Sequence, residues 1–189
     1  MINYVAYRKF VTLKNGRRVM FRFLNAEDRE GLTQLFKEAP AEDTMFLKQD
    51  VKDLKVINYW MENINYRKVL PLLAVDLEGN RIIADATLHR GKHAAKHIGE
   101  IRIFVSRSFR GLGLGSIMLE ELLSLALQEN LKWLKAEVLA DHKKVIKAFR
   151  NKGFETKCTL EEYFLRKDGV THDVVLMMRP VLKKEEAEF

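Results

Sequence analysis

The chain has 189 residues, of which 47% are hydrophobic and 31% are charged, and its formal net charge is +7. This length and composition are typical of one soluble domain with a full hydrophobic core. The lone cysteine, Cys158, excludes an internal disulfide framework and a cysteine metal cluster. No apolar run reaches the length of a membrane span and no signal-peptide pattern opens the sequence, so we expect a cytoplasmic protein.

The positive charge raises the question of a nucleic-acid partner. The sequence contains no helix-turn-helix, zinc-finger or RNA-binding aromatic pattern. We therefore expect the charge to lie on solvated surfaces and beside an anionic ligand, with nucleic-acid binding as a less favoured alternative.

Hydrophobic periodicity predicts the elements of the first half of the chain. Asn15 and Gly16 indicate a turn after an opening segment that fits a short extra strand. Beyond it we expect a strand at 19–23, helices at 27–38 and 51–64, and strands at 70–76 and 81–89. The turn at 78–80 joins the last two strands into a hairpin.

The second half begins with a basic loop at 89–97, followed by a strand at 98–105, a helix at 114–129 and a strand at 133–139. A strand, a crossover helix and a second strand are typical of a parallel βαβ unit. Two strands, at 161–166 and 172–178, and a charged tail at 183–189 close the chain. Because no internal repeat or linker is visible, we expect a single domain over residues 1–189.

The most informative stretch, at 110–116, reads Arg-Gly-Leu-Gly-Leu-Gly-Ser and lies between a predicted strand and a predicted helix. Glycines let the backbone come close to an anion, and the first amides of a helix point at it with the positive end of the helix dipole. Arg110 adds a fixed cation with forked donors. The stretch therefore predicts a cofactor that contains a pyrophosphate.

Three glycine motifs compete for this stretch. A P-loop requires a lysine after its last glycine, and none follows Gly115. In a dinucleotide fingerprint the third glycine would fall at Ser116 and the acidic ribose partner at the apolar Leu131, which disfavours that motif. The pattern Arg-x-x-Gly-x-Gly fits as written, with Arg110, Gly113 and Gly115.

This motif resembles the GNAT superfamily of N-acetyltransferases, and other segments carry the same resemblance. They are the strand end at 105–110, the segment 145–154 with its Gly-Phe ending, and the opening strand 19–24 followed by Ala-Glu-Asp at 26–28. Together they cover residues 17–181, the expected core of the domain. The resemblance implies an α/β (α+β) fold in which helices flank a central, mixed, splayed sheet, and acetyl-CoA as the cofactor.

By this resemblance, the cofactor-binding residues lie in two segments. The backbone of Ile103, Phe104 and Val105 binds the pantetheine arm and the thioester carbonyl. The pyrophosphate is held by the turn, that is, by Arg110, Gly111, Leu112, Gly113, Leu114, Gly115 and Ser116.

Glu100, on the strand before the turn, is the candidate general base, because family members often carry a glutamate there. Burial in a cleft would raise its pKa toward the useful range. The alternatives for this side chain are a solvent-facing position or an ion pair, for example with Arg102. Glu137 on the next strand is the alternative base.

The segment at 142–154 departs from the family pattern. His142 stands where an asparagine is common, and Phe149 stands where a tyrosine is the usual proton donor to the leaving thiolate. Phe149 cannot donate a proton, so water, Tyr163 or no acid serves instead. We expect Phe149 to pack against the cofactor and His142 either to contact it or to lie on the surface.

Two further features of the sequence are expected to have structural roles only. His89, His93 and His97 recur every four residues, but Gly91 interrupts the series within a loop, so we expect no metal site. Cys158 is expected to be a small, buried or half-buried hydrophobe.

The resemblance implies an acetyltransferase that moves an acetyl group directly from acetyl-CoA to a primary amine of a small molecule or a protein. A catalytically weak acyl-CoA sensor is the alternative, because the tyrosine is missing; a homodimer is one assembly open to such a domain. The acceptor wall is expected from residues 27–65 and the final strands. Acidic residues there could attract a cationic amine: Glu38, Glu42, Asp43, Asp50 and Asp53.

Overall fold

The computed structural model describes residues 2–166 and 169–181, so the predicted tail at 183–189 lies outside the described residues. The strands are β1 (Lys9–Thr12), β2 (Arg18–Phe23), β3 (Val69–Asp76), β4 (Arg81–Arg90), β5 (Ile98–Val105), β6 (Trp133–Leu139), β7 (Glu155–Leu165) and β8 (Thr171–Pro180). The helices are α1 (Arg29–Lys37), α2 (Ala41–Thr44), α3 (Leu54–Glu62), α4 (Leu114–Gln128) and α5 (Lys143–Arg150). Short 3-10 turns are η1 (Ala26–Asp28), η2 (His93–Ala95) and η3 (Arg107–Phe109).

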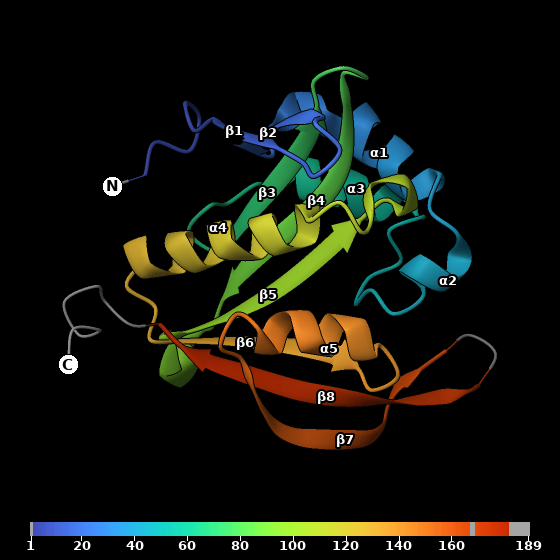
Figure 1. Ribbon diagram of the computed structural model, residues 1–189, viewed down its shortest axis with the longest axis vertical. Coiled ribbons are helices and arrows are strands. Elements are labelled where there is room, and N and C mark those ends of the chain that lie inside the picture. The colour runs from blue at the N-terminus through green and yellow to red at the C-terminus, as the bar shows by residue number, and fades with distance from the viewer. Residues whose placement is uncertain (1, 167–168, 182–189) are drawn as a thin grey trace. The chain divides into compact units, whose positions relative to one another are not determined.

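The described strands form a mixed sheet in the order β1-β2-β3-β4-β5-β6-β8-β7 (Figure 1). This α/β architecture confirms the predicted fold class. Residue contacts divide the chain into two compact units. The first unit comprises residues 1–87 and 103–118, and the second comprises residues 88–102 and 119–189. Strands β4 and β5 and helix α4 therefore contribute residues to both units.

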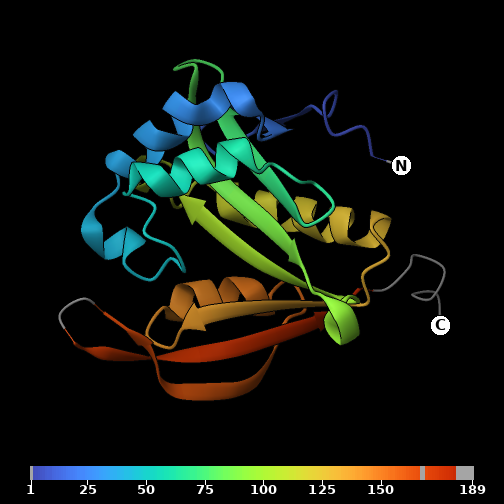
Figure 2. The same cartoon turned by 180° about the vertical axis from the view of Figure 1, so that it is seen from behind.

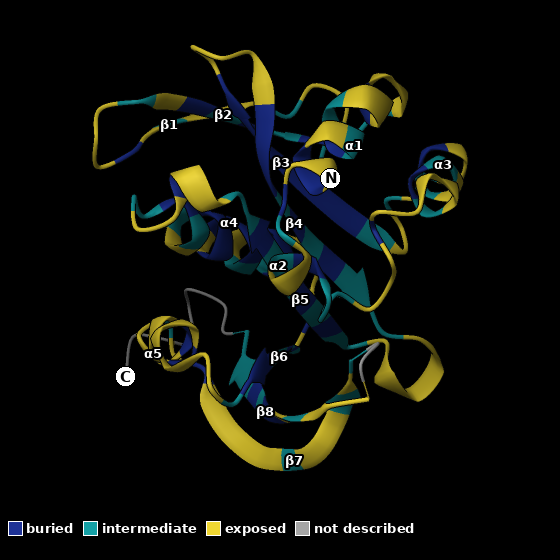
Figure 3. Ribbon diagram, turned by 90° about the vertical axis from the view of Figure 1, so that its right-hand side faces the viewer, coloured by how far each residue is buried: buried dark blue, intermediate teal, exposed yellow. Residues whose placement is uncertain are grey.

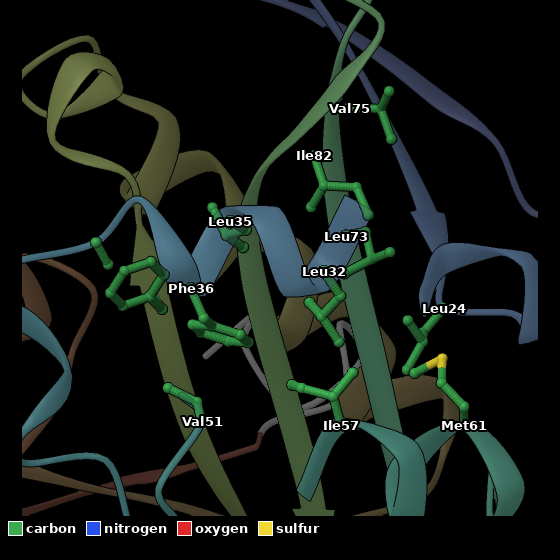
Figure 4. Close-up of a cluster of buried hydrophobic side chains, with 12 residues drawn as sticks. Leu24, Leu32, Leu35, Phe36, Val51, Ile57, Met61, Leu73, Val75 and Ile82 are labelled. Carbon is green, nitrogen blue, oxygen red and sulfur yellow. The ribbon is translucent and has the colours of Figure 1, made fainter. Parts of the chain in front are cut away.

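In the first unit, α1 and α3 lie side by side over one face of β3 and the start of β4 (Figure 2). The apolar stripe of α1 forms this contact through Leu32, Leu35 and Phe36, which are at most 4% exposed. Figure 4 shows these side chains meeting Ile57 of α3 and residues of β3. The Phe36 ring lies 5.3 Å from that of Phe104 on β5, so the core reaches the strand that precedes the glycine turn.

Strand β2 has the predicted alternation, because Val19, Phe21 and Phe23 are buried while the residues between them are not. It pairs antiparallel with β1 on one side and β3 on the other. The opening segment thus forms the extra strand that the sequence predicted. Gly16 has φ +84° in the turn between β1 and β2, a conformation that glycine adopts without steric cost.

In the second unit, β6 pairs parallel with β5 and antiparallel with β8. The pairing with β5 joins Ile98, Gly99 and Glu100 to 133–135. A Cβ added to Gly99 would lie within 2.8 Å of three leucine side chains, so only glycine allows this close packing. On the other side of β8, β7 is exposed along most of its length (Figure 3).

The differences from the predicted elements have local physical causes. The first helix begins with η1, where Asn25 and Asp28 form a capping box. Helix α3, predicted from residue 51, starts at Leu54 because the Asp53 carboxylate accepts a hydrogen bond from Lys55 N at 2.9 Å. Strand β7 starts at Glu155 instead of residue 161. The sequence did not indicate its first half, because most of its residues are exposed and carry no hydrophobic alternation.

The prediction that Cys158 is buried or half-buried is wrong: its side chain is exposed on β7. The short helix α2 was not predicted at all. The longest helix of the described residues, α4, has 15 residues, and no described helix is long and apolar enough to cross a membrane.

Replacing Phe36 by alanine should destabilise the protein by about 3–5 kcal/mol, because it leaves a cavity between α1, α3 and β5. Urea unfolding measures the change in the free energy of unfolding. Leu54→Ala, at a position that is 57% exposed, is the matched control and should cost less than about 1 kcal/mol. Equal costs for the two variants would contradict the described core.

Candidate active site

The glycine stretch forms a tight turn between β5 and α4, within the first unit. Gly111 has φ +77° and Gly113 has φ +88°, so both lie in the left-handed region that strains other residues. Gly115 has no positive φ, and a Cβ there would lie 3.7 Å from a methyl group of Val105, an ordinary contact. The backbone conformation therefore requires glycine at positions 111 and 113, whereas neither backbone conformation nor space requires it at position 115.

The turn presents unused hydrogen-bond donors. In the part of the chain that the structure describes, no acceptor pairs with the backbone amides of Gly111, Leu112 and Gly113. The first-turn amides of α4, at Leu114 to Ser116, have no intrahelical acceptor by helix geometry. A run of free amides at the positive end of a helix of 15 residues fits a phosphate group.

Arg110 is held by bonds on two sides. Its Nε donates to the Val105 carbonyl at 2.9 Å, and its two terminal nitrogens lie 3.1 and 3.0 Å from the Asp43 carboxylate oxygens. These bonds tie the end of β5 and helix α2 to the start of the turn. Because Asp43 is 67 residues away in the sequence, the tertiary fold creates this contact.

Arg107 completes an ion-pair network with the same helix. Its Nε lies 2.7 Å from Asp43, and a terminal nitrogen lies 2.5 Å from Glu42. Burial alone would raise the pKa of Asp43, but hydrogen bonds from Arg107 and Arg110 outweigh it and hold that pKa below its usual value. We call Glu42, Asp43, Arg107 and Arg110 the α2 clamp; its two carboxylates balance its two guanidinium groups.

Phe109, which lies between the two arginines of the clamp in the sequence, is buried and holds the start of the turn in place. Its ring is 1% exposed, and the guanidinium groups of Arg17 and Arg81 lie 5.1 and 5.7 Å from the ring centroid. Arg17 also pairs with the buried Asp76 at 3.2 Å. Cation–π contacts and this ion pair thus hold the residue that precedes Arg110.

Glu100 lies in the second unit, where it forms ion pairs and is not solvent-facing. One oxygen lies 2.7 Å from Arg102 Nε and the other 2.9 Å from Lys135 Nζ, and the side chain is 13% exposed. Lys135 also reaches Glu137 at 3.3 Å. Burial lowers the pKa of Lys135, but the two carboxylates prevail and raise it. Arg102 and Lys135 therefore hold the Glu100 carboxylate in an ion-pair network.

The candidate residues of the segment 142–154, around α5, also lie in the second unit. His142 is exposed just before α5 and makes no side-chain cap. Phe149 is 7% exposed, and its ring meets that of Phe154 edge-on at 5.0 Å. Tyr163 is 50% exposed on β7. Phe149 therefore packs against Phe154 within its own unit.

The three histidines do not share a helix face. His89 belongs to β4, His93 to η2 and His97 to the segment before β5. Within residues 2–166 and 169–181, no group of three or more His, Cys, Asp or Glu side chains is arranged to hold a metal ion.

Sequence reasoning missed two features of the first unit. The acidic residues Glu42 and Asp43 were assigned to the acceptor wall, but they pair with the arginines of the turn. Asp85 was overlooked: it lies half-buried in β4 between the buried Ala84 and Ala86, and burial raises its pKa to about 7. The available signal was an acidic residue inside the apolar run 82–86.

Comparison with known proteins identifies relatives of this chain. The sequence model of the acetyltransferase (GNAT) family matches residues 31–154. The GNAT domain of S. lividans PAT superposes with a TM-score of 0.75 at 22% identity, covering 92% of this chain and 96% of the other.

Two other solved structures are similarly close. A ribosomal-protein-alanine N-acetyltransferase from Brucella melitensis has a TM-score of 0.74 at 23% identity, with 85% and 98% of the two chains covered. A phosphinothricin acetyltransferase from Sinorhizobium meliloti, solved in complex with AcCoA, has a TM-score of 0.74 at 20% identity, with 86% and 88% covered.

Asp85→Asn should stabilise the protein above neutral pH. The pKa of Asp85 is about 7 in the folded state and about 4 in the unfolded chain, so the folded state binds more protons between these values. Stability is therefore lost as pH rises through this window, and the asparagine removes that loss. Urea unfolding should show a gain of about 1–3 kcal/mol at pH 8 and none near pH 4. Asp141→Asn, at an exposed position, is the control; the same profile in both variants would refute the assignment.

Proposed function

Because the chain belongs to the acetyltransferase (GNAT) family, we propose that it transfers an acetyl group from acetyl-CoA directly to a primary amine. The observation that carries the proposal is the turn at 110–116, with two positive-φ glycines and free amides at the start of α4. These donors suit the two phosphates that acetyl-CoA carries in its pyrophosphate.

The proposed cofactor contacts follow from this turn. The backbone amides of 111–116 donate to phosphate oxygens, and the clamped Arg110 fixes the position of the turn. The backbone of Ile103, Phe104 and Val105 binds the arm of the cofactor. We assign His142 and Phe149 as the remaining contacts. Bound acetyl-CoA supplies the acetyl group as a thioester.

The proposed base is Glu100. A primary amine must lose a proton before it can act as a nucleophile, and an ionised carboxylate accepts that proton. Arg102 and Lys135 lie within 3 Å of the Glu100 carboxylate and hold its orientation. The same cations stabilise the carboxylate and so weaken it as a base, which makes an amine of modest basicity the better acceptor. Glu137, the other carboxylate on Lys135, is the alternative base.

The acceptor can be a small molecule or a protein. The names of the relatives cover both, since one is named for phosphinothricin and one for an alanine of ribosomal proteins. Because Glu42 and Asp43 are paired with arginines, they are poor candidates for recognising a cationic amine. A cytoplasmic location and assembly as a homodimer complete the proposal.

A catalytically weak acyl-CoA sensor is the second candidate. Two observations favour it: Phe149 has no hydroxyl to protonate a leaving thiolate, and Glu100 is bound by two cations. Thiol release from acetyl-CoA, measured across polyamines, amino acids and peptide N-termini, separates the candidates. Release that depends on one amine class supports the enzyme, whereas tight binding of acetyl-CoA without release supports the sensor.

Gly113→Val should abolish acetyl-CoA binding, because a branched residue is strained at φ +88° and distorts the turn that presents the amides. Isothermal titration measures the affinity. Gly169→Val is the matched control, since Gly169 has φ +83° outside the site and no heavy atom within 4 Å of an added Cβ. The control should lose similar stability and keep its affinity. A folded Gly113→Val protein with normal affinity would refute the cofactor site.

Glu100→Gln should leave cofactor binding intact and lower the single-turnover rate about 100-fold near neutral pH. The loss should shrink at high pH, where the amine is already deprotonated. Glu137→Gln, measured in parallel, removes the other carboxylate on Lys135. If only the second variant loses rate, the base is Glu137; if Glu100→Gln loses rate equally at every pH, Glu100 has a structural role.

A further inference from the structure

Lys14, in the loop between β1 and β2, lies directly against the glycine turn. Its backbone amide donates to the carbonyl of Leu112 at 3.3 Å. Its side chain runs across Gly113: a Cβ added to that glycine would lie 3.6 Å from Cε, 3.8 Å from Cγ and 4.0 Å from Cδ of Lys14. The N-terminal hairpin therefore places an ammonium group beside the central glycine of the turn.

The loop that carries Lys14 is internally fixed. Leu13 is 3% exposed, and its amide donates to the carbonyl of Arg17 at 2.9 Å. The amide of Gly16 donates to the carbonyl of Leu13 at 2.9 Å, and that of Arg17 to the Asn15 side chain at 3.2 Å. Because both ends of the loop are bonded, the stem of Lys14 starts from a defined position.

Charge distinguishes Lys14 from the arginines of the turn. Arg107 and Arg110 are balanced by Glu42 and Asp43 in the α2 clamp. Among residues 2–166 and 169–181, no carboxylate pairs with the ammonium group of Lys14, which is exposed. Lys14 therefore adds an unbalanced positive charge next to the free amides of the turn, whereas the positive charge of Arg110 is balanced.

We propose that Lys14 is a diphosphate-binding residue, which supplies to the pyrophosphate of coenzyme A the positive charge that the clamped Arg110 does not. This inference rests on the proposed function. The amides of the turn provide directed hydrogen bonds, and a lysine provides a compact point charge that suits a phosphate oxygen. Arg110 is then a positioning residue that holds the turn in shape.

The test measures the binding of coenzyme A, 3′-dephospho-coenzyme A and pantetheine to the full chain by isothermal titration. Lys14→Gln should weaken the binding of both diphosphate ligands about 10- to 100-fold, the scale of a hydrogen bond to a charged group, and leave pantetheine binding unchanged. The difference in affinity between the wild-type protein and Lys14→Gln should decrease at high salt, because ions screen an exposed contact. Lys14→Arg should restore most of the affinity.

Arg18→Gln is the matched control, since it removes one exposed positive charge from the same hairpin. It should change the affinity less than twofold. Equal losses of affinity in Lys14→Gln and Arg18→Gln would mean that long-range electrostatic attraction, and not a contact, accounts for the effect, and would overturn the inference. A loss confined to coenzyme A would assign Lys14 to the 3′-phosphate and also overturn it.

The failure of the inference is separable from that of the proposed function. If the wild-type protein binds coenzyme A and Lys14→Gln binds it equally well, Lys14 is a solvated lysine and the cofactor site stands. If the wild-type protein binds neither diphosphate ligand, the cofactor assignment fails and the role of Lys14 fails with it. Thermal unfolding of each variant confirms that the fold is retained.

Discussion

The bidentate contact between Arg110 and Asp43 is the constraint on which the candidate site depends. It fixes the first residue of the glycine turn to helix α2, while the bond from Arg110 to the Val105 carbonyl fixes it to the end of β5. The two glycines that follow in positive-φ conformations can then present their amides in one direction. The turn is preorganised by side-chain bonds, so a bound anion need not order it.

The same principle of balanced charge recurs in the second unit. Lys135 lies between Glu100 and Glu137, and Arg102 holds the other oxygen of Glu100, so two carboxylates face two cations. Such groups keep their orientation but lose part of their chemical reactivity, because each charge is already stabilised by its partner. In the turn, the balanced Arg107 and Arg110 hold the backbone in position, and the unbalanced Lys14 is the proposed contact to the diphosphate.

Local patterns predicted much of the fold, since alternation at 19–23 and the glycines of the turn express constraints between neighbouring residues. Short or exposed elements were not predicted correctly. Helix α2 has four residues and no apolar periodicity, and β7 is exposed on most of its length, so neither leaves a clear pattern. Asp43, the partner of Arg110, was also not predicted, because tertiary packing decides this pairing. For Glu100, the ion pair with Arg102 was one of the predicted alternatives, whereas the contact with Lys135 depends on the register between β5 and β6.

The central claim is that the amides of the turn bind the diphosphate of coenzyme A. Amide chemical shifts of a ¹⁵N-labelled protein test it most directly, since glycine signals lie in a distinct region of the spectrum. The account predicts that coenzyme A shifts the amides of Gly111, Gly113 and Gly115, that pantetheine does not, and that Gly169 is unchanged by either. Equal shifts with both ligands, or none at the turn with saturating coenzyme A, would contradict it.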